Sequence, residues 1–382
     1  MALKKESARE DVGGGRSTLQ DEPPFLLAVD DGHNDTDVLW YDDQGVEHLV
    51  RFESSAVPGG RMMDFQGDSL AAMYDTEDQS FTCGPRRLLG AGLDTRTPDY
   101  PLSALNRILV AHAMRQAGIG SDTPVALVTG LPLKEWMSEK SRNIDVRRQG
   151  KMRNLALPVT GKDGWNRPAI VWQDVYPEAL SAYAYGRASR ALPAGNTAII
   201  DIGGRTTDIA VVIVDDDGVP DRIDTERSGT EEFGVLQVRD ILGGLLAAHL
   251  KADSVADRVI DQVFTKRTAL IYGELMDFSS LIVAAAQNVR TSILNAVRHR
   301  LGSGADFSSV WVVGGGAHLI DLSGGLPDRW QVLVADEPEF ANVRGMYLRM
   351  EKAMRESGFK HPSTSRSPGA YAPAEKIGDD VD

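Results

Sequence analysis

Residues 197–214 read TAIIDIGGRTTDIAVVIV. Two apolar runs, 197–201 and 208–214, stand on either side of the glycine pair Gly203 and Gly204. Runs rich in Val, Ile and Thr that are bounded by glycine are typical of strands joined by a tight turn. Because glycine has no Cβ, the backbone N–H groups of such a turn can close on phosphate oxygens. The stretch therefore predicts a hairpin suited to holding a phosphate chain.

The start of the chain repeats this pattern. Strand-like runs at Phe25–Asp30, Asp37–Tyr41 and Val46–Phe52 predict an antiparallel meander, and its first turn contains Asp31 and Gly32. An Asp-Gly turn between strands is usually no more than a hairpin turn. The motif indicates a phosphate site only in combination with the other glycine-rich turns of the chain.

A third glycine-rich turn, Gly314–Gly316, follows the apolar run Val310–Val313. Two meanders separated by helical segments predict a duplicated α/β architecture. Asp30 and Asp201 stand at equivalent points of the two meanders. Two carboxylates facing a polyphosphate are what hydrated Mg²⁺ requires, because this ion prefers oxygen ligands and keeps several waters. We therefore expect a cleft between two domains that holds a nucleotide and Mg²⁺.

Composition excludes several classes of function. The 382 residues contain 41 Lys and Arg against 55 Asp and Glu, a formal net charge of −14. Broad direct binding to DNA or to an anionic membrane needs basic surface, so neither is expected. The single cysteine, Cys83, excludes an intramolecular disulfide and a cysteine zinc site. No apolar run is long enough to span a bilayer, and the N-terminal segment lacks the apolar core of a secretory signal, so we expect a cytoplasmic protein.

The pattern along the chain suggests the domain boundaries. The polar segments 1–24 and 361–382 are expected to be disordered tails. Domain I would comprise residues 25–195 plus about 340–360, and domain II residues 196–339. Helices are expected after Ser103, at Glu178–Tyr185 behind Pro177, and along most of 231–300.

Taken in order, these motifs resemble the actin/Hsp70/sugar-kinase ATPase superfamily, and most closely the plasmid-segregation actins of the ParM/StbA type. Asp30-Asp31-Gly32 is similar to their phosphate-1 loop, Asp201–Asp208 to their phosphate-2 loop, and Gly314–Ala317 to their adenosine loop. Three shorter segments also resemble the family: Thr129–Leu133, Val175–Glu178 and Gly345–Leu348. The likeness covers about residues 25–350.

The resemblance implies an actin-like ATPase fold, in which two duplicated ribonuclease-H-like domains surround a cleft for ATP or GTP with Mg²⁺. It implies that Glu178 orients the attacking water and that Asp30 and Asp201 hold Mg²⁺ through water, with Asp201 also counted as catalytic. The residues that would contact the nucleotide are Asp31, Gly32, His33, Asn34, Arg148, Gly203, Gly204, Arg205, Thr206, Gly314, Gly315, Gly316 and Ala317.

Three of these residues also have an ordinary structural interpretation. Glu178 could simply complement the dipole of a helix N-terminus. Arg205 could be a solvent-facing loop residue, and Arg148 could belong to a solvated helix face together with Arg147, Lys151 and Arg153.

The function that the resemblance implies is an ATPase that polymerises into filaments and segregates plasmid or similar DNA. The partners would be further copies of the chain and a small basic DNA-binding adaptor of the ParR type, with no direct contact to DNA. Two alternatives use the same fold: a small-molecule kinase and a non-polymerising assembly factor.

Overall fold

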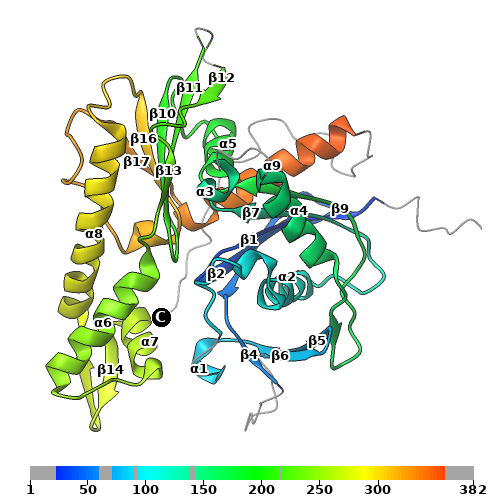
Figure 1. The fold of residues 1–382 in the computed structure, drawn as a ribbon, viewed down its shortest axis with the longest axis horizontal. Helices are drawn as coiled ribbons and strands as arrows, with labels where there is room; N and C mark the ends of the chain where they lie inside the picture. The colour runs from blue at the N-terminus through cyan, green and yellow to red at the C-terminus, as the bar shows by residue number, and fades with distance from the viewer. Residues whose placement is uncertain are drawn as a thin grey trace, which may run out of the picture.

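The computed structural model describes residues 23–59, 71–89, 93–137, 143–215, 217 and 219–357. The expectation of disordered tails falls almost entirely outside these residues. The described chain forms two α/β halves that lie side by side, each built on its own main sheet (Figure 1).

The first main sheet contains the N-terminal meander. Its strands, in spatial order, are β3 (Glu47–Glu53), β2 (Asp35–Tyr41), β1 (Phe25–Asp31), β7 (Val125–Leu131) and β9 (Ile170–Pro177). The first three strands are antiparallel, and β7 and β9 then pair in parallel. The predicted meander is therefore confirmed, with strand ends that differ by one or two residues.

The second main sheet repeats this arrangement. Its strands are β12 (Pro220–Ile223), β11 (Thr207–Val214), β10 (Thr197–Ile202), β16 (Ser309–Val313) and β17 (Val332–Val334), and β13 (Gly229–Glu231) also pairs with β11. Here too an antiparallel hairpin is followed by parallel strands. Register makes the correspondence close, because Asp30 pairs with Asp37 in one hairpin and Asp201 pairs with Asp208 in the other. The predicted duplication is confirmed.

Each half carries a smaller unit at its outer end. In the first half this is a four-stranded sheet with its helices, formed by β4 (Ala56–Pro58), β6 (Gln79–Cys83), β5 (Ala72–Thr76), β8 (Thr160–Gly161), α1 (Arg86–Leu89), η2 (Tyr100–Leu102) and α2 (Ala104–Gln116). Helix α2 begins where Ser103 predicts, because the Ser103 hydroxyl accepts a hydrogen bond from the Asn106 N–H at 3.1 Å.

In the second half the smaller unit contains α6 (Val235–Leu250), α7 (Asp257–Lys266), β14 (Thr268–Ile271), β15 (Glu274–Asp277) and α8 (Ser279–Leu301). The expectation of helices along most of 231–300 was wrong at 268–277, where β14 and β15 form a hairpin. A short apolar run has no periodicity long enough to separate a strand from a helix, and here the Tyr272-Gly273 turn decides for the hairpin.

The remaining helices connect and cover the sheets. They are α3 (Leu133–Met137), α4 (Asn143–Ala156), α5 (Leu180–Ala188), η3 (Gly315–His318), η4 (Pro338–Phe340) and α9 (Ala341–Glu356). The start of α5 corrects the prediction of a helix from Glu178, because Pro177 still pairs with Leu131 in the first sheet and the helix begins only at Leu180. None of the helices among the described residues is long and apolar enough to cross a membrane.

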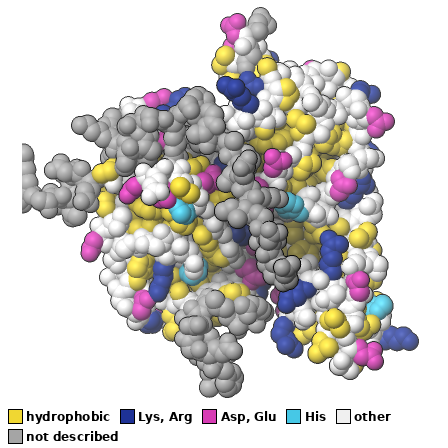
Figure 2. All heavy atoms as spheres, turned by 180° about the vertical axis from the view of Figure 1, so that it is seen from behind, with side chains coloured by type: hydrophobic (Ala, Val, Ile, Leu, Met, Phe, Trp, Pro, Cys, Tyr) yellow, Lys and Arg dark blue, Asp and Glu magenta, His cyan; other side chains and the backbone are white. Residues whose placement is uncertain are grey.

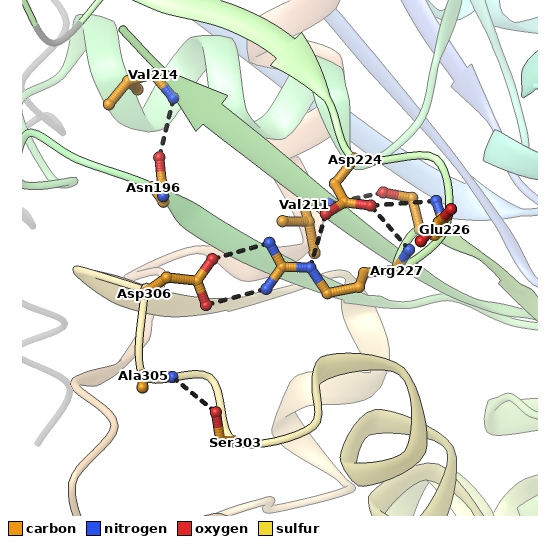
Figure 3. Close-up of polar contacts among 10 residues, drawn as sticks. Asn196, Val211, Val214, Asp224, Glu226, Arg227, Ser303, Ala305 and Asp306 are labelled. Carbon is orange, nitrogen blue, oxygen red and sulfur yellow. Dashed lines mark hydrogen bonds and ion pairs between the residues drawn. The ribbon is translucent and has the colours of Figure 1, made fainter. Parts of the chain in front are cut away.

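Arg227 joins two loops of the second half through its charged side chain. The Arg227 guanidinium donates to both carboxylate oxygens of Asp306, at 3.0 and 2.8 Å, and its Nε donates to Asp224 at 2.8 Å (Figure 3). The same group lies over the Phe307 ring, 4.9 Å from its centre. Such paired donors hold the loop after α8 against the segment between β12 and β13.

Helices α5 and α9 cross at Gly345. A Cβ added to this glycine would overlap the Ser181 carbonyl group, so the two helix backbones touch only because residue 345 has no side chain. This contact carries α9 across the first sheet, where Val343, Met346 and Tyr347 join its core.

We expect Gly345→Ala to lower the free energy of unfolding by about 1–3 kcal/mol, the usual cost of forcing an extra carbon into a close-packed contact. The control is Gly244→Ala in α6, where a Cβ would meet nothing within 4 Å. That change should raise stability by up to ~1 kcal/mol through helix propensity. Urea unfolding of the two variants measures both effects, and equal stability of Gly345→Ala and the parent chain would contradict the close contact.

Candidate functional site

The two hairpins open onto one cleft between the halves of the molecule. The cleft has a volume of about 670 Å³. Twelve of the residues predicted from the sequence line it: Asp30, Gly32, His33, Asn34, Glu178, Asp201, Gly203, Gly204, Thr206, Gly314, Gly315 and Gly316. Tertiary structure therefore brings together loops from distant parts of the chain, from Asp30 to Gly316.

The two phosphate-type loops approach each other directly. A Cβ at Gly204 would lie 2.7 Å from the Cβ of Asn34 and 2.8 Å from its backbone nitrogen. Since real Cβ atoms do not come so close, only glycine allows the two loops to face each other at this distance. The loops thus form opposite walls of one narrow site.

The N-terminus of α6 fixes the second loop. The N–H groups of Val235 and Leu236 donate to the carbonyl oxygens of Gly203 and Gly204, at 3.1 and 2.8 Å. A Cβ at Gly234 would lie 2.5 Å from the Gly204 oxygen, so this junction also requires glycine. The first N–H groups of a helix have no partner within the helix, and here the loop supplies it.

The third glycine-rich turn packs against the same carboxylate. Gly314 has a φ of 83°, and a Cβ there would overlap Asp201 Oδ1. Both the backbone conformation and the lack of space require glycine at this position. The turn after β16 therefore closes over Asp201 from its own side of the cleft.

Carboxylates dominate the electrostatics of the cleft. Burial raises the pKa of Asp30 well above its ordinary value, and the charges of Asp37 and Asp201 raise it further. Burial likewise raises the pKa of Glu178, with added repulsion from Asp30 and Asp208. Burial raises the pKa of Asp208 to about 8. Among the described residues, no cationic side chain forms an ion pair with these three acids, so in the ligand-free cleft burial and mutual repulsion favour their protonated forms.

This donor set fits a hydrated divalent cation. The acids offer oxygen ligands, and their mutual repulsion favours a bound cation. Within the part of the chain that the structure describes, no three acidic, histidine or cysteine side chains converge to hold a metal directly. A cation at this site would therefore keep water ligands, as Mg²⁺ does.

Asn342 is a site residue that the sequence did not reveal. Its Nδ2 donates to Asp201 Oδ2 at 2.6 Å, and its Oδ1 accepts the N–H of Ala179 at 3.0 Å. Ala179 directly follows Glu178 and has the unusual φ of 59°. Asn342 thus holds the phosphate-2 aspartate and the turn that carries Glu178 in a fixed relation. An Asn near the start of a helix, 141 residues after Asp201, carries no sequence signal for this role.

Lys151 is a second residue whose role the sequence did not reveal. The sequence suggested a solvated basic helix face, but the Lys151 side chain is only 2% exposed. Its ammonium group lies 2.7 Å from Asp31 Oδ2 and donates to the Gly130 carbonyl at 2.5 Å. Asp31 also accepts a hydrogen bond from Asn106. Asp31 therefore faces the protein interior and does not line the cleft.

The structure places three other predicted residues beside the cleft or away from it. Arg148 donates to Asp174 at 2.9 Å and does not line the cleft. Arg205 pairs with Glu232 at 3.0 Å, next to the phosphate-2 loop. Ala317 lies in η3, one residue beyond the cleft lining.

His33 and Glu178 do line the cleft. Burial, aided by the charge of Arg205, lowers the pKa of His33 to about 4, so its ring is neutral near pH 7. Glu178 precedes α5 by two residues, and its Oε1 would lie 3.2 Å from a Cβ at Gly130. Its carboxylate is thus directed at the end of β7 and the cleft, and the interpretation as a first-turn helix residue does not hold.

Comparison with protein families supports the resemblance seen in the sequence. Residues 25–188 match the family model for the N-terminal part of the plasmid segregation protein ParM, StbA_N. Residues 199–323 match the model for the C-terminal part of an archaeal actin homologue that is MreB-like. The chain has no match among curated proteins.

Solved structures show the same fold at low identity. A 15-stranded ParM filament from Clostridium botulinum is 18% identical, with a TM-score of 0.68 over 87% of this chain and 100% of that one. The archaeal actin homologue Ta0583 is 19% identical, with a TM-score of 0.68 over 86% of this chain and 99% of that one. Its complex with ADP is 20% identical, with a TM-score of 0.67 and the same coverage. The fold is that of these actin homologues, and the resemblance to ParM/StbA-type proteins is confirmed.

The raised pKa of Asp208 predicts a pH effect on stability. Between its ordinary value of 3.8 and about 8, the folded protein binds more protons at this carboxyl than the unfolded chain does. Stability of the ligand-free protein should therefore rise as pH falls through that window. Asp208→Asn keeps an acceptor for its two donors, the Leu133 N–H and the Thr230 hydroxyl, but removes the charge. We expect the variant to melt higher than the parent near pH ~8 and the gap to close toward pH ~5. A gap that is independent of pH would contradict the assignment.

Proposed function

We propose that this actin-fold protein binds ATP with Mg²⁺ in the cleft, hydrolyses it, and polymerises into filaments in its ATP-bound state. The observation that carries the proposal is the pairing of two glycine loops across a cleft whose buried acids, Asp30, Glu178 and Asp208, have no cationic ion-pair partner among the described residues. Glycine loops provide N–H donors for phosphate oxygens, and the acids provide the ligands for a hydrated cation. An acidic protein cannot hold a polyphosphate by its net charge, so it needs this combination.

Each cleft residue has a distinct part in this proposal. The loops at Gly32–Asn34 and Gly203–Thr206 bind the phosphates from opposite sides, and Gly314–Gly316 lies toward the nucleoside. Asp30 and Asp201 hold the waters of the bound Mg²⁺, which neutralises phosphate charge when present. Glu178 orients the attacking water, and Asn342 keeps Glu178 and Asp201 in register through the Ala179 N–H and the Asp201 carboxylate.

The electrostatics of the ligand-free cleft support this assignment of Glu178. Its raised pKa comes from burial and from neighbouring acids, and Lys151 opposes the shift. A bound cation opposes it further, so Glu178 would be ionised when Mg²⁺ and nucleotide are present. An ionised carboxylate can accept a hydrogen bond from water, which is the arrangement that phosphoryl transfer to water needs.

The cellular role that we propose is segregation of plasmid or similar DNA. The match of residues 25–188 to the ParM N-terminal model supports it. A net charge of −14 makes direct DNA contact unfavourable, so the link to DNA would be a small basic adaptor of the ParR type. Opposite charges on the chain and on such an adaptor would favour their association.

Assembly can be tested by pelleting and electron microscopy. With Mg²⁺ and a non-hydrolysable ATP or GTP analogue, the protein should form filaments, because the bound nucleotide joins the two halves of the molecule. Comparing the two analogues reveals the base preference. Protein that remains monomeric at tens of micromolar, yet transfers phosphate from ATP or GTP to a small molecule in a separate assay, would favour the kinase alternative, and monomer without transfer would favour the assembly factor.

The role of Glu178 can be tested by Glu178→Ala. We expect phosphate release to slow roughly 10²-fold or more, the scale of a positioned acid–base group. Nucleotide binding should persist because the loops are unchanged, so filaments should form with ATP and last longer than those of the parent. The contrasting variant is Asp201→Ala, which removes a cation ligand and should abolish both nucleotide binding and assembly. Phosphate release of Glu178→Ala at the parental rate would remove Glu178 from the mechanism.

A further inference from the structure

Arg51 is the one Lys or Arg side chain among the described residues that line the cleft. His33 also lines it, but its ring is neutral near pH 7. Figure 2 shows a face of the molecule on which Lys and Arg side chains lie scattered among Asp and Glu side chains. Cationic groups are dispersed over this surface, and within the described lining of the cleft the Arg51 guanidinium is the side chain that can neutralise phosphate charge.

The register of the first sheet places Arg51 in line with two acids of the cleft. Asp30 pairs with Asp37 across β1 and β2, and Asp37 pairs with Arg51 across β2 and β3. Residues directly opposite each other share a face of the sheet, and neighbouring strands lie about 4.8 Å apart, so the Arg51 backbone lies roughly 10 Å from that of Asp30. A cation held at Asp30 and the Arg51 guanidinium can therefore contact different parts of one phosphate chain.

Asp37 fixes the orientation of this guanidinium. Arg51 Nε and Nη2 donate to the two carboxylate oxygens of Asp37, at 2.7 and 2.9 Å, a paired geometry that restrains the planar group. The Asp37 side chain is only 6% exposed, whereas that of Arg51 is 31% exposed. The Phe340 ring adds a second support, because its centre lies 5.4 Å from Arg51 Cζ. The carboxylate is thus the buried end of the pair and the guanidinium is the accessible end.

The guanidinium keeps donors available for a ligand. Arginine has five N–H groups, of which two donate to Asp37, and the other three have no acceptor within the part of the chain that the structure describes. These donors lie beside the third glycine-rich turn, because a Cβ added to Gly315 would be 3.2 Å from Arg51 Nη2 and 3.6 Å from Nη1. Arg51 belongs to the first half of the molecule and Gly315 to the second. The available donors therefore lie where the two halves meet.

We propose that Arg51 binds the nucleotide by donating hydrogen bonds to the phosphate oxygens nearest the nucleoside. This proposal rests on the nucleotide binding proposed above and adds a contact that neither the glycine loops nor the acids supply. Because Gly314–Gly316 lies toward the nucleoside, Arg51 meets the α- or β-phosphate and not the γ-phosphate that is transferred. The contact is then common to ATP and ADP. An interaction that is equally strong in the ground state and the transition state tightens binding without accelerating the chemical step.

A matched pair of variants isolates the guanidinium. Arg51→Met alone would leave the buried Asp37 carboxylate without its partner, so it is combined with Asp37→Asn, and Asp37→Asn alone is the control. The probe is Mg²⁺-ADP, or Mg²⁺-GDP if the parent prefers guanine. The control should bind the probe at least as tightly as the parent, because it loses an acid of the cleft and keeps the cation. The double variant should bind it at least about tenfold more weakly than the control, the scale of a hydrogen bond between charged groups.

Turnover kinetics separate this role from one in the chemical step. In the double variant the KM for the nucleoside triphosphate should rise by the same factor as the Kd of the diphosphate, while kcat stays within about threefold of the control. Arg51→Lys keeps a charge beside Asp37 but not the planar set of donors, so its affinity should lie between those of the control and the double variant. Thermal unfolding without ligand verifies that each variant is folded.

Two results would overturn the contact and leave the proposed function standing. Equal diphosphate affinity of the double variant and the control would mean that Arg51 serves only as the partner of Asp37. A loss of affinity confined to the triphosphate would mean that the guanidinium contacts the γ-phosphate instead. A parent chain that binds neither ATP nor GTP would overturn both this contact and the proposed function.

Discussion

Repulsion among buried carboxylates is the constraint to which the rest of the cleft is adapted. Asp30 and Asp201 lie one residue before the ends of the first strands of the two hairpins. Asp208 faces Asp201 across its hairpin, and Glu178 follows the end of β9. Keeping these carboxylates ionised costs free energy without a bound cation, because each charge raises the pKa of its neighbours. The glycine turns around it supply N–H donors at close range, and the cleft is in this way prepared for a cation with its phosphates.

Helix α9 contributes both to the cleft and to a second groove, which lies between α5, α9 and β12. Asn342, in the first turn of α9, holds Asp201 and the Ala179 N–H, while Leu348, in its second turn, lines this groove. Gly345 lies between them, where α9 touches the backbone of α5. Packed helices move as rigid bodies, so a shift of Asp201 or of the Glu178 turn would also move the groove residues on α9.

Local sequence predicted some parts of the site well and others poorly. The strand-turn-strand units were predictable because alternation and glycine act over a few residues. The start of α5 was misplaced, since proline is compatible with both a strand end and a helix start, and sheet pairing with Leu131 decides between them. The hairpin at 268–277 was missed because the apolar run 269–271 is too short for its periodicity to separate a strand from a helix. Asp31 was assigned to the cleft, but the buried Lys151 draws it inward.

By itself the sequence determined the duplicated α/β fold, the three glycine turns and the pair of aspartates, because each depends on short-range chemistry of strands and turns. Only the tertiary structure decided which side chains meet. It turned Asp31 toward Lys151, tied Arg148 to Asp174, and brought Asn342 from the far end of the chain to Asp201. Such contacts depend on how two sheets and their helices pack, and no local pattern encodes the distance between residues that are 141 positions apart.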